Sequence, residues 1–188
     1  MREVDAALKH LEEWNAPVTV AKPSLLDADK DEIMLIKEPL GAVLVISPWN
    51  FPLLASMPSV AALTAGNTVV LKLSEYSSTF SSVFAGLVSE YFAKKLFAAV
   101  EGAIPEVTAL LAERFDHIMY TGNPTVARVI MAAAAKNLTP VTLELGGKNP
   151  VLVEPDADIE DAAKKIIVSK MLNSGQICVS SDYVSAFL

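Results

Sequence analysis

The sequence has only one cysteine, Cys178, and only two histidines, His10 and His117, among its 188 residues. A single thiol cannot close a disulfide within the chain, and no second cysteine is present to share a metal ion, so we predict no metal site. Cys178 is then either a small, buried and inert apolar side chain, as free cysteines commonly are, or a nucleophile. A cysteine–histidine pair is disfavoured, because His10 falls in an amphipathic helical pattern and His117 at the start of a predicted strand.

Long apolar runs and an excess of positive charge are also missing. Apolar residues make up 52% of the chain, yet no run of about 18 of them, the length of a membrane-spanning helix, occurs. Lysine and arginine number 15 against 22 aspartate and glutamate residues, a net charge of -7, which argues against nucleic acid as a partner. The chain does not open with a charged segment, an apolar core and a small-residue cleavage site, so we expect no secretory signal and a cytoplasmic protein.

What the sequence does contain is a regular alternation of two hydrophobic patterns. Apolar runs of strand length predict strands at residues 41–46, 68–72, 97–100, 117–120 and 141–145. Apolar residues at helical spacing predict helices at residues 4–14, 60–63, 80–91, 107–111 and 126–133. Strands that alternate with helices in this way indicate an α/β fold, with a parallel sheet flanked by helices on both faces.

The pattern changes near Glu144, where two glycines interrupt the last of these strands. A short apolar run follows at residues 151–153, and apolar residues then share one helical face, with Asp158 placed as the helix N-cap. We therefore predict one domain over residues 1–143 and the start of a second α/β domain over residues 144–188.

Two polar residues stand out by their surroundings. Glu144 lies between two leucines in a predicted strand, where a buried carboxylate is costly unless it has a function. Burial there would strengthen it as a base toward water. Asn50 lies between Pro48 and Pro52, and its amide is either an ordinary turn residue or a donor held ready for a developing oxyanion.

Two further positions favour ligand binding. Lys72 ends a predicted strand, which is where ligands collect in open parallel sheets, although a solvated charge could equally stand there. Residues 122–127 follow another strand and open a helix, so their backbone amides can face a pyrophosphate. As a dinucleotide fingerprint this turn is poor, because it has one glycine and not three.

Five segments, in this order along the chain, resemble the NAD(P)-dependent aldehyde dehydrogenase superfamily, and most of all its class 3 or fatty aldehyde dehydrogenase branch. They are residues 48–52 (PWNFP), 71–75 (LKLSE), 115–122 (FDHIMYTG), 142–148 (TLELGGK) and 173–178 (NSGQIC). The resemblance implies a Rossmann-like cofactor domain over residues 1–143, incomplete at its N-terminus, and the truncated beginning of the catalytic domain over residues 144–188. It also implies an oxidoreductase that converts an aldehyde to a carboxylic acid with NAD(P)+.

The resemblance assigns this chemistry to individual residues. Cys178 would attack the aldehyde and pass through a thiohemiacetal and a thioester, Asn50 and the Cys178 N–H would bind the oxyanion, and Glu144 would activate water. The residues implied in binding NAD, or NADP in its place, are Trp49, Lys72, Glu75, Gly122, Asn123, Pro124, Thr125, Val126, Ala127 and Leu145. Lys72 is implied at the adenosine ribose. Glu75 would accept hydrogen bonds from the ribose hydroxyls and repel a 2'-phosphate, which favours NAD.

The chain departs from the family pattern in residue type and in length. Leu73 and Ala127 replace a proline and a glycine, and Pro124 removes one N–H from the helix start. Family members also extend well beyond both ends of this chain. The first interpretation is therefore an aldehyde-oxidising enzyme or a piece of one, in a homo- or hetero-oligomer. The second is a catalytically inactive truncated or splice-variant fragment that binds nucleotide or a full-length subunit. A coenzyme-A-acylating enzyme would share Cys178 but would have no need of Glu144.

Overall fold

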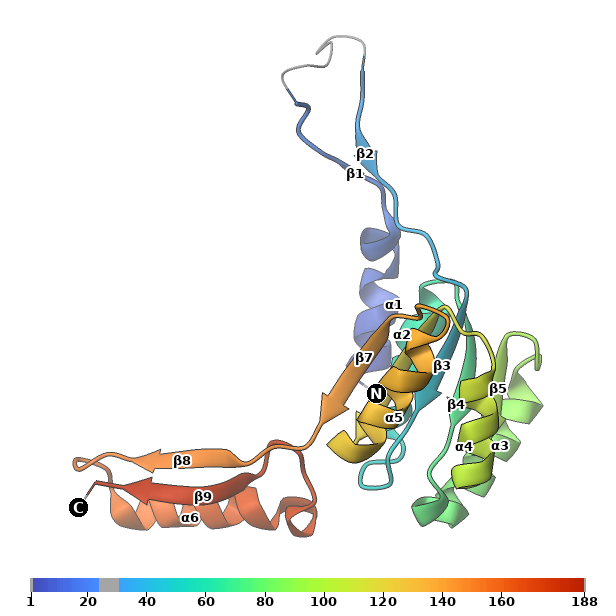
Figure 1. Ribbon diagram of the computed structural model, residues 1–188. Helices are drawn as coiled ribbons and strands as arrows, with labels where there is room; N and C mark the ends of the chain where they lie inside the picture. The colour runs from blue at the N-terminus through green and yellow to red at the C-terminus, as the bar shows by residue number, and fades with distance from the viewer. Residues whose placement is uncertain (1, 24–30, 188) are drawn as a thin grey trace.

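The computed structural model describes residues 2–23 and 31–187, so Met1 and Leu188, at the outer ends of the two predicted domains, lie outside the described residues. A five-stranded parallel sheet in the order β5-β4-β3-β6-β7 forms its centre (Figure 1). The strands are β3 (Ala42–Ile46), β4 (Thr68–Lys72), β5 (Phe97–Val100), β6 (His117–Gly122) and β7 (Val141–Leu145). The predicted parallel α/β fold is confirmed.

The order of the strands reverses at the middle of this sheet. From β3 the chain runs outward through β4 to β5, and it then returns to the other side of β3 to form β6 and β7. Loops that follow β3 and β6 therefore leave the sheet in opposite directions and open a crevice between them. Ligands bind at such a switch point, beyond the carboxyl ends of the strands, in open α/β sheets.

Helices cover both faces of the sheet and bury two separate apolar clusters. The helices α4 (Ile104–Ala112) and α5 (Pro124–Ala135) pack on one face, over a cluster that includes Leu44 and Ile118. On the other face, α2 (Pro58–Thr64) and α3 (Ser78–Tyr91) pack over a second cluster, which includes Val45 and Leu71. Because alternate residues of β3 point to opposite faces, Leu44 and Val45 belong to different clusters.

Two N-terminal elements lie beside this core. The helix α1 (Arg2–Asn15) packs against α2, in agreement with its predicted amphipathic pattern. After it, β1 (Val18–Thr19) pairs antiparallel with β2 (Met34–Leu35), and the two strands project away from the sheet (Figure 1). This pair was not predicted, because two-residue strands are too short to show a period. No helix among the described residues is long and apolar enough to cross a membrane.

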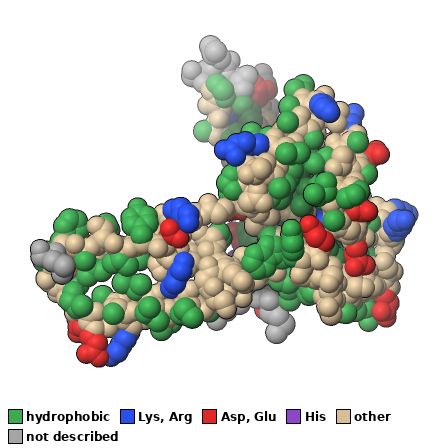
Figure 2. Space-filling view, turned by 60° about the horizontal axis from the view of Figure 1, so that its bottom comes forward, with side chains coloured by type: hydrophobic (Ala, Val, Ile, Leu, Met, Phe, Trp, Pro, Cys, Tyr) green, Lys and Arg blue, Asp and Glu red, His purple; other side chains and the backbone are tan. Residues whose placement is uncertain are grey.

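Beyond β7 the chain leaves the central sheet and forms a small second unit. Its strands β8 (Asn149–Val153) and β9 (Ser181–Ala186) pair in parallel, and α6 (Ile159–Met171) connects them. Asp158 caps α6 as predicted, since its side chain accepts a hydrogen bond from the Asp161 N–H at 3.0 Å. Hydrophobic side chains are spread over this unit (Figure 2), and Val168 and Val179 are 72% and 75% exposed. The predicted domain limit between residues 143 and 144 stays a prediction, because β7 still pairs with β6.

Candidate active site

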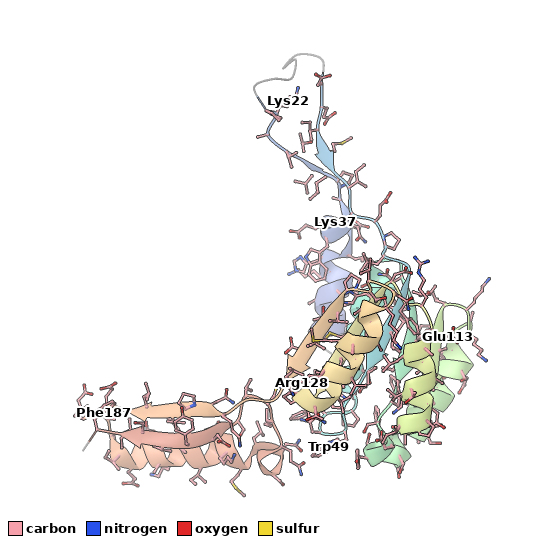
Figure 3. The ribbon with its side chains drawn as sticks, viewed as in Figure 1. Lys22, Lys37, Trp49, Glu113, Arg128 and Phe187 are labelled. Carbon is pink, nitrogen blue, oxygen red and sulfur yellow. The ribbon has the colours of Figure 1, made fainter. Side chains whose placement is uncertain are left out.

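A cleft of about 680 Å³ lies beyond the carboxyl ends of the strands, at the switch point between β3 and β6. Residues that follow β3, β4, β6 and β7 line it, together with residues along α4, the first half of α5 and the segment around Cys178. Figure 3 shows Trp49 in the loop that follows β3. Eleven predicted site residues line this cleft: Trp49, Asn50, Lys72, Glu75, Gly122, Asn123, Pro124, Val126, Glu144, Leu145 and Cys178.

Cys178 is exposed, which contradicts the interpretation as a buried apolar side chain. It lies in the loop between a short 3-10 segment, η3 (Leu172–Gly175), and β9. Within η3 the backbone has positive φ at three successive residues: Asn173 (48°), Ser174 (57°) and Gly175 (78°). A non-glycine residue in this region costs roughly 1–2 kcal/mol, so contacts elsewhere must hold this loop in place.

Asn50 supplies one of these contacts. Its Nδ2 donates to the Gln176 carbonyl at 2.7 Å, and the Asn173 Nδ2 donates to the Asn50 carbonyl at 2.9 Å. The turn after β3 and the loop before Cys178 are thus joined, although they lie far apart in the sequence. An amide NH₂ has two donor hydrogens. One of them makes the bond to Gln176.

Glu144 lines the cleft, but the expectation that it is buried is wrong: its side chain is exposed. The reason is the two-residue period of a strand, which sends Glu144 to the opposite face from its neighbours. Leu143 and Leu145 pack against the apolar cluster under α5, and Glu144 points away from it. The leucines beside Glu144 in the sequence therefore do not surround it in space.

Lys72 is deeply buried at the end of β4, with a side chain only 3% exposed. Its Nζ donates to the Leu73 carbonyl at 2.6 Å and to the Glu75 carboxylate at 3.3 Å. A buried ammonium must be paired in this way to be tolerated. The interpretation of Lys72 as a solvated charge is thus wrong. The side chain of Glu75 is 39% exposed, so part of its carboxylate is accessible to a ligand.

The turn between β6 and α5 presents a capped helix start to the cleft. The Asn123 Oδ1 accepts from the Val126 N–H at 2.9 Å, and the Asn123 N–H donates to the Tyr120 hydroxyl at 3.0 Å. A side chain at position 122 would collide with this hydroxyl, because a Cβ on Gly122 would lie 2.1 Å from it. Pro124 occupies the first helical position, where its missing N–H has no partner within the helix to lose.

Thr125 and Ala127, by contrast, do not line the cleft. Ala127 is 2% exposed and packs in the apolar cluster between α5 and the sheet. Its methyl group fills a contact between helix and sheet, and its place in the cofactor site stays a prediction. The departure from glycine at this position affects packing and not the wall of the cleft.

Tyr120 allows a test of how this turn is held. Burial raises the pKa of its phenol, and the hydrogen bond with Asn123 opposes the rise. The folded pKa thus lies above the unfolded value of about 10, so the contribution to stability is complete below about pH 10 and is lost as the pH rises through the folded pKa. We expect Tyr120→Phe to lower the free energy of unfolding by about 1 kcal/mol at neutral pH. The variant should also lose less of this free energy than the wild type as the pH becomes alkaline. Urea unfolding measures both effects. An unchanged alkaline decline in the variant would contradict this assignment.

Sequence reasoning missed the apolar wall of the cleft. Ile104, Val107, Leu111 and Val129 line it from α4 and α5, and Ile104 is 78% exposed. Val107 and Leu111 also pack against the apolar cluster under these helices, so their spacing in the sequence marks them only as core residues. The start of α4 is fixed by Glu106, which accepts from the Ala103 N–H at 2.7 Å, and this bond lowers the pKa of the carboxyl.

Two residues beside the cysteine were also missed. Asn149 donates to the Cys178 carbonyl at 2.8 Å, and a Cβ on Gly147 would lie 3.0 Å from the same oxygen. Within residues 2–23 and 31–187, no three histidine, cysteine, aspartate or glutamate side chains gather as metal ligands.

Known proteins resemble this chain over nearly its whole length. Residues 1–185 match the aldehyde dehydrogenase family. The dimeric NADP-preferring aldehyde dehydrogenase of Rattus norvegicus is 47% identical over 185 residues, which are 98% of this chain and 40% of that protein. The substrate-bound structure of Staphylococcus aureus AldH superimposes with a TM-score of 0.93 at 35% identity, over 98% of this chain and 40% of its own.

A third comparison includes a bound nucleotide. The Mycobacterium tuberculosis aldehyde dehydrogenase complexed with NAD+ is 28% identical, with a TM-score of 0.83 over 97% of this chain and 37% of its own. The chain thus spans about 40% of the length of the relatives that it matches.

Proposed function

The chain belongs to the aldehyde dehydrogenase family, and we propose that it carries the nucleophile and most of the nucleotide site of an enzyme that oxidises an aldehyde to a carboxylic acid. One observation carries the proposal: Cys178, Asn50 and Glu144, from three distant segments, line one cleft with Lys72. Within the proposal, residues 1–143 form the cofactor domain and residues 144–188 begin the catalytic domain.

Cys178 would act as the nucleophile. Its sulfur attacks the carbonyl carbon of the aldehyde, and the resulting thiohemiacetal oxygen accepts hydrogen bonds from the Asn50 Nδ2 and the Cys178 N–H. Loss of a hydride from this adduct leaves a thioester on Cys178. Glu144 then takes a proton from the water that attacks the thioester, which releases the acid. Its exposure toward the cleft gives that water access to the carboxylate.

The lining of the cleft suits a dinucleotide. The apolar side chains of α4 and α5 fit an adenine ring, Lys72 and Glu75 fit ribose hydroxyls, and the start of α5 fits a pyrophosphate. When bound, NAD(P)+ would supply the hydride acceptor. The partly free carboxylate of Glu75 favours NAD, because it would repel a 2'-phosphate. NADP remains an alternative, in view of the NADP preference stated in the name of the rat relative.

The proposal is tested by measuring aldehyde-dependent NADH formation and NAD(P) binding with the purified chain. Trp49 lies in the cleft, so nucleotide binding should change its fluorescence, and a Trp49→Phe variant separates its signal from that of Trp14. We expect binding of NAD but little turnover, because the apolar surface of the second unit is exposed. A chain that neither binds NAD(P) nor reacts at Cys178 would rule the proposal out.

The exposed surface also favours the second function. A chain that binds nucleotide without turnover could associate with a full-length subunit through apolar residues of α6 and β9, such as Val168 and Val184. Robust aldehyde-dependent NADH formation by the chain alone would exclude this alternative.

Lys72→Met should separate the charge of Lys72 from its packing. Methionine fills the buried space of the lysine stem but cannot donate to a ribose hydroxyl or pair with Glu75. We expect the dissociation constant for NAD to rise about tenfold or more, as the loss of a charged hydrogen bond predicts. Lys136→Met, at an exposed position outside the cleft, is the matched control in the same fluorescence titration. Equal affinities for the two variants would remove Lys72 from the nucleotide site.

A further inference from the structure

Asn149 lies directly behind the cysteine. It begins β8, is half-buried, and uses its Nδ2 for two hydrogen bonds, to the Cys178 carbonyl at 2.8 Å and to the Ser180 carbonyl at 3.0 Å. A single side-chain amide thus bridges two carbonyls that flank Val179. Asn149 itself is not among the residues that line the cleft.

Gly147 lies close to the same carbonyl. A side chain there would fit tightly, because a Cβ would lie 3.0 Å from the Cys178 oxygen and 3.1 Å from the Asn149 amide. A contact of that length requires the neighbouring atoms to move slightly. The Cys178 carbonyl therefore has a donor in Asn149 and little free space on the side of Gly147.

The other carbonyls of the loop are also occupied. The Gln176 carbonyl accepts from Asn50, and the Ile177 carbonyl accepts from the Ser180 N–H at 3.0 Å. Because each peptide unit is planar and trans, fixing its oxygen also fixes its N–H in the opposite direction. The bond at Ile177 therefore orients the Cys178 N–H, and the bond from Asn149 orients the Val179 N–H.

We propose that Asn149 is a positioning residue, which holds the carbonyls of Cys178 and Ser180. The Ser180 N–H in turn holds the Ile177 carbonyl, so that the thiol and the Cys178 N–H are presented together to the cleft. The inference rests on the proposed function, in which that N–H binds the oxyanion. Asn149 itself touches no reacting atom. Its loss should therefore impair reactions that build an oxyanion on the thiol, and spare reactions that need only the thiol.

Two reagents separate these cases, and Cys178 is the only cysteine with which they can react as a thiol. With p-nitrophenyl acetate, the sulfur bonds to the carbonyl carbon, p-nitrophenolate leaves with its electron pair, and the thiol proton goes to solvent, through a tetrahedral oxyanion. With iodoacetamide, the sulfur displaces iodide from carbon and no oxyanion forms. The ratio of the two rate constants therefore reports on the positioning of the thiol and not on its exposure.

We expect Asn149→Ala and Asn149→Asp to lower the acylation rate constant about tenfold or more, with alkylation changed less than about threefold. Aspartate keeps the size of asparagine but cannot donate, so it tests the hydrogen bonds and not the packing. Gly147→Ala should give the same signature by pushing the Cys178 carbonyl from the other side. Asn137→Ala, an exposed asparagine far along the chain from this loop, is the control and should change neither rate. Provided that the wild-type chain is acylated faster than Cys178→Ala, unchanged acylation in the Asn149 variants, or an equal fall in both rates, would overturn the inference.

Hydrogen exchange gives a readout that does not depend on acyl chemistry. We expect amides of residues 176–180 to exchange about tenfold faster in Asn149→Ala and Asn149→Asp, and at the wild-type rate in Asn137→Ala. Unchanged exchange in this segment would refute the positioning role. If the wild-type chain is acylated no faster than Cys178→Ala while exchange responds as expected, the oxyanion function fails and the positioning role of Asn149 stands.

Discussion

Cys178→Ala is expected to reduce acylation of the chain by p-nitrophenyl acetate by about 10³-fold or more, to the rate of the uncatalysed reaction. The thiol is exposed in the cleft and is the sole cysteine, so no other thiol can replace it. The measurement is the burst of p-nitrophenolate, whose amplitude should equal one per active chain in the wild type and zero in the variant. A mass increase of one acetyl group should accompany the wild-type burst.

Cys178→Ser is the matched control for shape, because it keeps a side chain of similar size and replaces a good nucleophile with a poor one. Circular dichroism of all three proteins checks that the fold is intact. A burst in Cys178→Ala of more than about a tenth of the wild-type amplitude would show that another group is acylated and would contradict the assignment.

Glu144→Gln is expected to leave that burst intact and to slow the steady-state release of p-nitrophenolate by about 10²–10⁴-fold, the usual contribution of a general base. The first acyl transfer needs the thiol and the oxyanion donors, whereas hydrolysis of the thioester needs water to be deprotonated. Glutamine preserves the size of Glu144 at its exposed place in the cleft. The protein that accumulates with an acetyl group on Cys178 should be visible by mass spectrometry.

Glu113→Gln is a suitable control for this variant. Glu113 follows the last residue of α4 (Figure 3) and does not line the cleft, so its replacement should change neither phase. Persistent steady-state turnover in Glu144→Gln would end the assignment of Glu144 as the base.

Most of the sheet could be predicted from the sequence, because buried parallel strands are continuous apolar runs with sharp limits. The strands at residues 68–72, 97–100 and 141–145 have the predicted bounds. The burial of Glu144 was predicted wrongly, because neighbours in a strand point to the opposite face. The pair β1 and β2 escaped prediction, since a two-residue strand carries no periodic signal.

The candidate site was predictable only in part, for a related reason. Motif residues at strand ends, such as Lys72 and Gly122, could be placed because the carboxyl ends of parallel strands meet at one edge. The contacts of Asn149 and Gly147 with Cys178 could not be, because they depend on how β8 pairs with β9 after the chain has left the sheet. Ala127 was placed in the cleft by its position in a motif, and only the packing of α5 shows that it faces the core.

The position of β3 at the centre of the sheet has a consequence for the kinetics of folding. Its pairing with β4 closes a short loop, but its pairing with β6 must wait until β4, α3, β5 and α4 have been placed. Pairings between distant segments are slow to form, because loop-closure entropy is lost before they contribute stability. The crevice between β3 and β6 should therefore appear late, and acquisition of nucleotide binding during refolding should lag behind the recovery of helical circular dichroism.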